Sequence, residues 1–245
     1  MALQHGKTHA LYLDGINLSG VANQGSVSAD IDTAEVTTFA DTAKTFLEGD
    51  YTHSFSGTTF YDNTDDGWDE QAWTAVTTQD DDHYIANVVG GATAGNVVYE
   101  QTVRWTNEAH NFDIGSAIII PLAFQGTDRL GRGKVNYAGT VTATGNKTGQ
   151  NYGATASTAT KYVTYRLVSV TGSGSITMEI QESSDDGAGD AYATVSGSTS
   201  GAMTTVGTAV KKTITAATEA YLRLTTTAYS GFTSVTVLVT VTTAA

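Results

Sequence analysis

In residues 51–61, YTHSFSGTTFY, the large side chains of Tyr51, His53 and Phe55 alternate with small polar ones. This two-residue period is typical of a β-strand with one buried face. Residues 25–32, GSVSADID, repeat that period, with Asp30 and Asp32 on the polar face. In the first stretch Gly57 predicts a bulge or a close backbone approach. The chain is rich in Thr, Val, Ser and Gly, which favour strands and tight turns. The sequence therefore predicts a mainly β protein.

Further strands are predicted in the N-terminal part, at residues 9–13, 83–89, 97–106 and 114–125. The last contains Pro121, which cannot donate to a ladder, so we expect this strand at an edge or a bulge. One helix is predicted at residues 66–79, where Trp68, Ala72 and Val76 recur at helical spacing. The helix is expected to pack against a sheet.

Charge divides the chain unevenly. The net charge is −13; residues 1–134 hold 19 acidic and 6 basic residues, whereas residues 135–245 hold 6 of each. This break predicts a first domain at residues 1–145, a Gly/Ser/Thr/Asn-rich linker at 146–160 and a second domain at 161–245. Six short strands are predicted in the second domain, at residues 161–170, 175–181, 191–195, 209–215, 220–226 and 234–241. Such spacing is typical of an immunoglobulin-like β-sandwich.

Several kinds of chemistry find no support. The chain has no cysteine, hence no disulfide and no thiolate ligand or nucleophile. It has no GxSxG motif, and its histidines lack metal-ligand spacing. His53 is expected to be a satisfied core or interface residue. We predict no catalytic residue, no cofactor, no metal site and no enzymatic activity.

The segment SSDDGAGDAY, residues 183–192, has two readings. Asp185, Asp186 and Asp190 could ligate calcium through oxygen, but their spacing differs from that of an EF-hand. A turn between strands is the favoured interpretation.

Membrane insertion and nucleic-acid binding are also disfavoured. The longest apolar run, residues 117–124, is far shorter than the ~20 residues that span a bilayer. The first residues lack the basic and apolar regions of a secretory signal, so we expect synthesis in a cytoplasm. A strongly acidic domain should not bind DNA tightly. An alternative role for the acidic surface is only to keep the protein soluble.

Several segments together resemble the major tail proteins, or tail-tube proteins, of bacteriophages with long, non-contractile tails. In the N-terminal half these are LYLDGINLSG (residues 11–20) and EVTTFADTAKTFLEGDYTHSFSGTTFYD (residues 35–62). RGKVNYAGTVTATGN (residues 132–146) is similar to the end of such a domain. SITMEIQESSDDGAGDAYATV (175–195) and EAYLRLTTTA (219–228) are similar to the β-sandwich appended to several of these proteins.

The resemblance implies a structural protein of the virion tail. Such proteins form hexameric rings that stack into a tube, through which viral DNA passes without tight binding. The N-terminal domain would build an inner barrel and the second domain would decorate the tube. The partners would be copies of the chain itself and other tail proteins, with no membrane involved. Asp30 and Asp32 would be lumen-facing acids that repel phosphate.

A loop between early strands reaches the neighbouring ring in this family, and here it corresponds to residues 41–50, ahead of a strand expected to begin at Tyr51. The predicted contact residues are three apolar anchors and a polar rim: Phe39, Phe46 and Leu47, with Asp41, Lys44, Glu48 and Asp50. Alternatively, Phe46 and Leu47 fold back onto their own core.

Two other functions stay open at this stage. The chain could be an adhesin or glycan-binding β-sandwich module, with Tyr162, Tyr165, Tyr192 and Tyr229 as its aromatic platform. It could also be a capsid decoration protein. Glycan binding would support the first and capsid binding the second.

Overall fold

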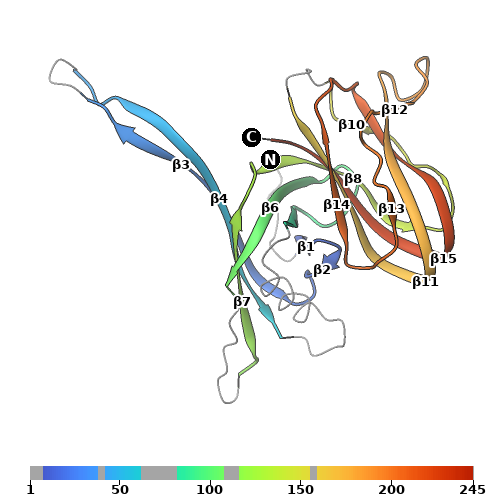
Figure 1. Cartoon of the computed structure of the whole chain (residues 1–245), viewed down its shortest axis with the longest axis horizontal. Coiled ribbons are helices and arrows are strands. Elements are labelled where there is room, and N and C mark those ends of the chain that lie inside the picture. The colour runs from blue at the N-terminus through green and yellow to red at the C-terminus, as the bar shows by residue number, and fades with distance from the viewer. Residues whose placement is uncertain (1–7, 38–41, 62–81, 108–115, 155–158, 245) are drawn as a thin grey trace. The chain divides into compact units, whose positions relative to one another are not determined.

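The computed structural model describes residues 8–37, 42–61, 82–107, 116–154 and 159–244 (Figure 1). Strands dominate this part of the chain and pair antiparallel, which confirms the mainly β prediction. The helix predicted at residues 66–79 lies outside the described residues. Contacts divide the chain into a first unit (Met1–Gly20, His83–Gln101 and Gly131–Ala245) and a second unit (Val21–Asp82 and Thr102–Leu130).

The first unit follows one path of paired strands, in the order β12-β11-β15-β8-β6-β5-β1-β2. These strands are β1 (Ala10–Leu13), β2 (Ile16–Asn17), β5 (His83–Val88), β6 (Val97–Asn107), β8 (Gly131–Val141), β11 (Lys161–Ser183), β12 (Ala193–Thr194) and β15 (Tyr221–Ala244). Beside them, β9 (Gly145–Asn146) and β10 (Gln150–Asn151) pair with β15, and β13 (Ala202–Met203) and β14 (Ala209–Ile214) pair with β11. The strands predicted at residues 9–13, 83–89 and 97–106 are confirmed.

Strands β11 and β15 pair with each other along nearly their whole length, from Lys161 opposite Thr243 to Ser183 opposite Tyr221. The prediction of four short strands in these two stretches is wrong. Apolar alternation correctly marks each half as a strand. It does not distinguish a turn that ends the pairing from a bend within it.

The bend lies near Gly172 and Gly231. Their φ angles of 89° and 79° are open to glycine at little cost, and register shifts in the pairing cluster beside them. Residues from both halves of β11 and β15 then share one core. Its members from these strands include Val163, Tyr165, Leu167, Ile176, Met178, Ile180, Leu222, Leu224, Val237 and Val239.

The predicted domain limits do not coincide with the two contact units. Strand β8 pairs with the last part of β15, from Gly131 opposite Ala244 to Val141 opposite Val235. Within the predicted linker, residues 146, 150 and 151 also pair with β15. The limits 1–145, 146–160 and 161–245, and the immunoglobulin-like nature of the last part, stay predictions.

The second unit has the strand order β3-β4-β7-β6, with β3 (Ala22–Glu35), β4 (Phe46–Phe60), β7 (Ile119–Gly126) and the second part of β6. Phe55 and Phe124 are buried at its centre, with ring centroids 6.0 Å apart. Trp105 packs on Phe124 at 4.6 Å. These aromatic contacts hold β4, β7 and β6 together.

Two local predictions about the second unit are confirmed. Among the described residues, Pro121 pairs with Thr58 of β4, and β6 reaches β7 only at residues 123–126, which places Pro121 at an edge of this part of the sheet. Gly57 allows a close backbone approach, because a Cβ there would lie 2.7 Å from the carbonyl oxygen of Gln24.

Candidate assembly surface

One part of strand β4 is paired on one side only. Strand β7 pairs with β4 at residues 54–60, so within the described ranges residues 46–53 pair with β3 alone. Residues 29–36 and 45–53 therefore form a two-stranded ribbon, called the ribbon below (Figure 1). A free hairpin of this kind is only marginally stable in water.

Part of the predicted loop is a strand of the ribbon. The sequence predicts a loop at residues 41–50 before a strand at Tyr51, but β4 already begins at Phe46, opposite Glu35. The pairing continues one step further, where the Val36 amide donates to the Thr45 carbonyl at 2.9 Å. Residues 46–50 do not alternate clearly, so cross-strand pairing rather than their own pattern makes them a strand.

Buried contacts fix the base of the ribbon. The His53 ring is 3% exposed and lies against Gly126, where a Cβ would overlap it. Its Nε2 contacts the Asp128 carbonyl, and the Gln125 side-chain amide donates to the His53 carbonyl at 3.0 Å. His53 is thus a core residue, as predicted. Gly126, which makes room for it, was missed because an isolated glycine does not reveal which residue it will contact.

Large apolar side chains are exposed along the ribbon. Phe46 is 53% exposed and Leu47 59% exposed, so they do not fold back onto their own core in the isolated chain. Ile31 is 52% exposed and Val36 39% exposed. The last two are not among the predicted contact residues, and alternation assigns Ile31 to the buried face of its strand. That expectation is wrong for Ala29 and Ile31, both exposed.

Charged side chains surround these apolar residues. Lys44 Nζ contacts Glu35 Oε2 at 2.8 Å, and both side chains are well exposed. Glu48 and Asp50 are also exposed. Of the predicted contact set, Lys44, Phe46, Leu47, Glu48 and Asp50 thus belong to the ribbon or its end, whereas Phe39 and Asp41 lie outside the described residues.

Asp30 and Asp32 lie on β3 and are exposed, as expected of a polar face. Asp30 is opposite Thr52, and Asp32 lies at a register shift between Ile31 and Thr33. The ribbon thus carries both the predicted lumen-facing acids and part of the predicted contact set.

The acidic loop at residues 183–192 is closed by its own hydrogen bonds. The Asp185 carboxylate accepts backbone amides from Gly189 at 2.6 Å and Asp190 at 3.1 Å, and Asp190 accepts the Ser184 amide at 2.8 Å. Within the described ranges, no group of three or more His, Cys, Asp or Glu residues is placed to hold a metal ion. The turn interpretation fits this geometry.

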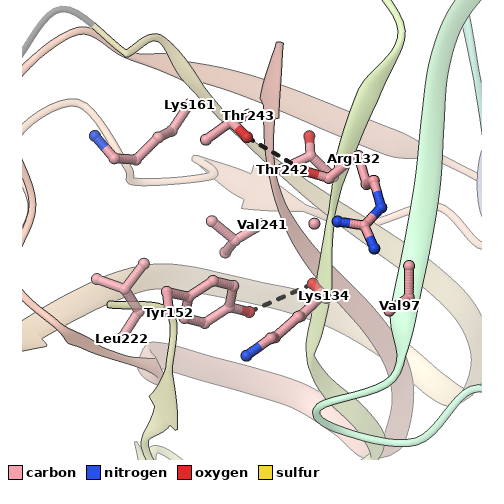
Figure 2. Close-up of a pocket in the computed structure, with 10 residues that line it drawn as sticks. Val97, Arg132, Lys134, Tyr152, Lys161, Leu222, Val241, Thr242 and Thr243 are labelled. Atoms are coloured by element: carbon pink, nitrogen blue, oxygen red, sulfur yellow. Dashed lines mark hydrogen bonds between the residues drawn. The ribbon is translucent and has the colours of Figure 1, made fainter. Parts of the chain in front are cut away.

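A pocket of about 240 Å³ in the first unit is the other candidate (Figure 2). Its cationic lining residues include Lys134 and Lys161. Their ammonium groups donate to the carbonyls of Asn151 at 2.7 Å and Ala216 at 3.0 Å. Burial lowers the pKa of Lys161. Because these amines are already bonded to the backbone, the pocket is a weaker candidate than the ribbon.

The tyrosines suggested for glycan stacking do not form a free platform. Tyr165 is fully buried and donates to the Ser198 carbonyl at 2.6 Å. Tyr229 packs against the core. Cations cover the rings of the other two: Lys211 lies 3.8 Å from the Tyr162 ring centre and Arg223 lies 3.8 Å from that of Tyr192.

No protein-family model matches the sequence, and no curated protein matches it significantly. Among solved structures, a chain of the virion of a native gene transfer agent particle is 17% identical, with 52% of this chain and 97% of that chain covered and a TM-score of 0.44. A chain of the SPP1 tail tube is 9% identical, with 51% and 76% covered and a TM-score of 0.44. The SPP1 Dit protein is 12% identical, with 95% and 98% covered and a TM-score of 0.35. Similarity at this level does not by itself establish a shared fold or function.

No helix among the described residues is long and apolar enough to cross a membrane.

Proposed function

We propose that this chain is a structural, non-enzymatic subunit of a bacteriophage tail tube. Copies would close into hexameric rings, and the rings would stack into a conduit for viral DNA in the virion tail. The observation that carries the proposal is the ribbon, which exposes Ile31, Val36, Phe46 and Leu47. An exposed, two-stranded element with this much apolar surface needs a partner to cover it. The resemblance in sequence points to another copy of the chain as that partner.

Unpaired strand edges supply a second means of assembly. Within the described residues β3 pairs only with β4, and its 14 residues contain neither proline nor lysine to block pairing. In the part of the chain that the structure describes, residues 119–122 of β7 are likewise paired on one side. Pairing of two different edges between copies is a heterologous contact, which is the type that closes rings.

The charge distribution suits a conduit. The net negative charge is confined to residues 1–134, the part assigned to the inner wall, and Asp30 and Asp32 are its proposed lumen-facing acids. A negative wall repels phosphate, so DNA would pass without tight binding. The neutral part, residues 135–245, would lie away from the lumen, where it can contact neighbouring copies of the chain, other tail proteins or solvent.

Replacing both central apolar residues tests this proposal. The double variant Phe46→Ser/Leu47→Ser should fold normally, because both side chains are exposed in the single chain, yet fail to form tubes. The matched control is Val206→Ser, which removes an apolar side chain that is 46% exposed in the first unit. Electron microscopy of both variants gives the readout. Tubes of normal length from the double variant would contradict the role of the ribbon.

A further inference from the structure

The pairing register places Phe46 and Leu47 on opposite faces of the ribbon. Phe46 is opposite Glu35 and Leu47 is opposite Ala34. Cross-strand partners share a face, and successive residues of a strand point to opposite faces. One flat surface can therefore cover Phe46 or Leu47, but not both.

Each face carries a second exposed apolar residue. Between Ile31 and Thr33 the extra residue of the register shift lies on β4, where Tyr51 and Glu48 are the partners, so alternation along β3 continues. Ile31 therefore shares the face of Glu35 and Phe46. Val36 follows Ala34 by two residues and shares the face of Leu47. The exposures are 52% and 53% on the first face and 39% and 59% on the second. Both faces of the ribbon thus expose apolar side chains, whereas an amphipathic hairpin has them on one face only.

We propose that the ribbon is inserted between two neighbouring copies of this chain. One copy covers Ile31 and Phe46 on the first face. The other covers Leu47 and Val36, at the far end of the second face, and leaves Asp30 and Asp32 of that face uncovered. This inference rests on the proposed function and adds to it the number of acceptors for each ribbon. An element that contacts two copies links three chains, so it joins laterally adjacent subunits as well as stacked ones.

Charge indicates which part of the acceptors is contacted. The ribbon, together with Lys44 at its end, carries five carboxylates and one lysine, so two ribbons repel each other. Residues 135–245 have no net charge. The acceptor surface is therefore expected in that neutral part of the neighbouring copies. The buried contacts of His53 anchor the base of the ribbon, which reduces the ordering that binding requires.

Site-specific photocrosslinking tests the two-acceptor geometry, and the absence of native cysteine makes it direct. Thr33→Cys places a benzophenone-maleimide label on the Phe46 face, and Ala34→Cys places one on the Leu47 face. Both positions are exposed. Each labelled variant, and the double variant, is mixed as a small minority with unlabelled chains. The mixture is assembled, irradiated and separated on a denaturing gel.

The single variants should each give a two-chain product, with crosslinked peptides that map to two different surfaces of the acceptor. The double variant should give a three-chain product. Two-chain products alone from the double variant, or one acceptor surface for both labels, would overturn the inference while leaving assembly through the ribbon intact. The absence of any product from assembled tubes would contradict the ribbon's role in the proposed function as well.

Discussion

The base of the ribbon depends on the absence of a side chain at Gly126. The buried His53 imidazole occupies the space that a Cβ at position 126 would need. The sequence predicts a satisfied histidine at position 53 from strand alternation alone. It does not predict the glycine, because the two residues are 73 positions apart and meet only through the pairing of β4 with β7.

The variant Gly126→Ala should therefore destabilise the chain. Inserting a methyl group into a packed site costs about 1–3 kcal/mol, because the His53 ring has to shift. Chemical denaturation of the single chain measures the change. Gly20→Ala is the control, since the space that its new methyl group would fill is open to 4 Å, and its effect should be small. Equal stability of the two variants would show that His53 relocates freely.

The Arg166–Glu100 ion pair is the second residue-scale feature. Arg166 is fully buried and contacts Glu100, and the Thr240 hydroxyl donates to Glu100 at 2.8 Å. Arg166→Met should leave a buried carboxylate without its partner and cost about 3–5 kcal/mol of unfolding free energy. The control Arg104→Met removes an exposed pair and should cost less than about 1 kcal/mol. Denaturation curves that shift equally would contradict this account.

Acid should loosen the loop at residues 183–192. Backbone hydrogen bonds, chiefly from the Asp190 amide and also from Gly189, lower the pKa of Asp185. A carboxyl whose folded pKa is lowered stabilises the loop above the unfolded pKa of about 3.9, and this stabilisation is lost as pH falls through the lower folded pKa. The Gly189 amide proton should therefore shift upfield in NMR spectra below that pH. Asp185→Asn should abolish the transition, and an unchanged transition would assign it elsewhere.

At the scale of elements, the sequence predicts where strands exist better than where they end. The ranges 83–89 and 97–106 match β5 and β6 closely because both are rich in residues that favour strands and β5 is followed by a turn with Gly90 and Gly91. The long strands β11 and β15 are each divided in the prediction because their bends at glycine look like turns in sequence. The predicted start of β4 is late for the opposite reason, since residues 46–50 become a strand only through β3.

The candidate site, too, could be predicted only in part. The sequence predicts Phe46 and Leu47 as contact residues, and the structure places both on an exposed ribbon. The role itself stays a prediction. Their separation onto two faces cannot be seen if the segment is a loop, because a loop has no fixed alternation. Ile31 was missed as a contact residue because alternation assigns it to a buried face. Its exposure is seen only in the structure, where none of the described residues buries this part of β3.

On the scale of the whole molecule, composition and topology support the same proposal from different directions. The acidic part of the chain contains the ribbon, including β3, which among the described residues pairs with β4 alone. The neutral part contains the long bent pair β11 and β15 with its own core. A subunit that must bind copies of itself but not DNA benefits from this division. The central claim of the proposal is therefore that copies of the chain assemble with one another.

The most direct measurement is electron microscopy of the purified wild-type chain, before and after concentration, beside Phe46→Ser/Leu47→Ser under identical conditions. The account predicts hollow tubes or six-fold rings from the wild type, and single folded chains from the variant. Single chains from both proteins at every concentration, or tubes from both, would contradict it.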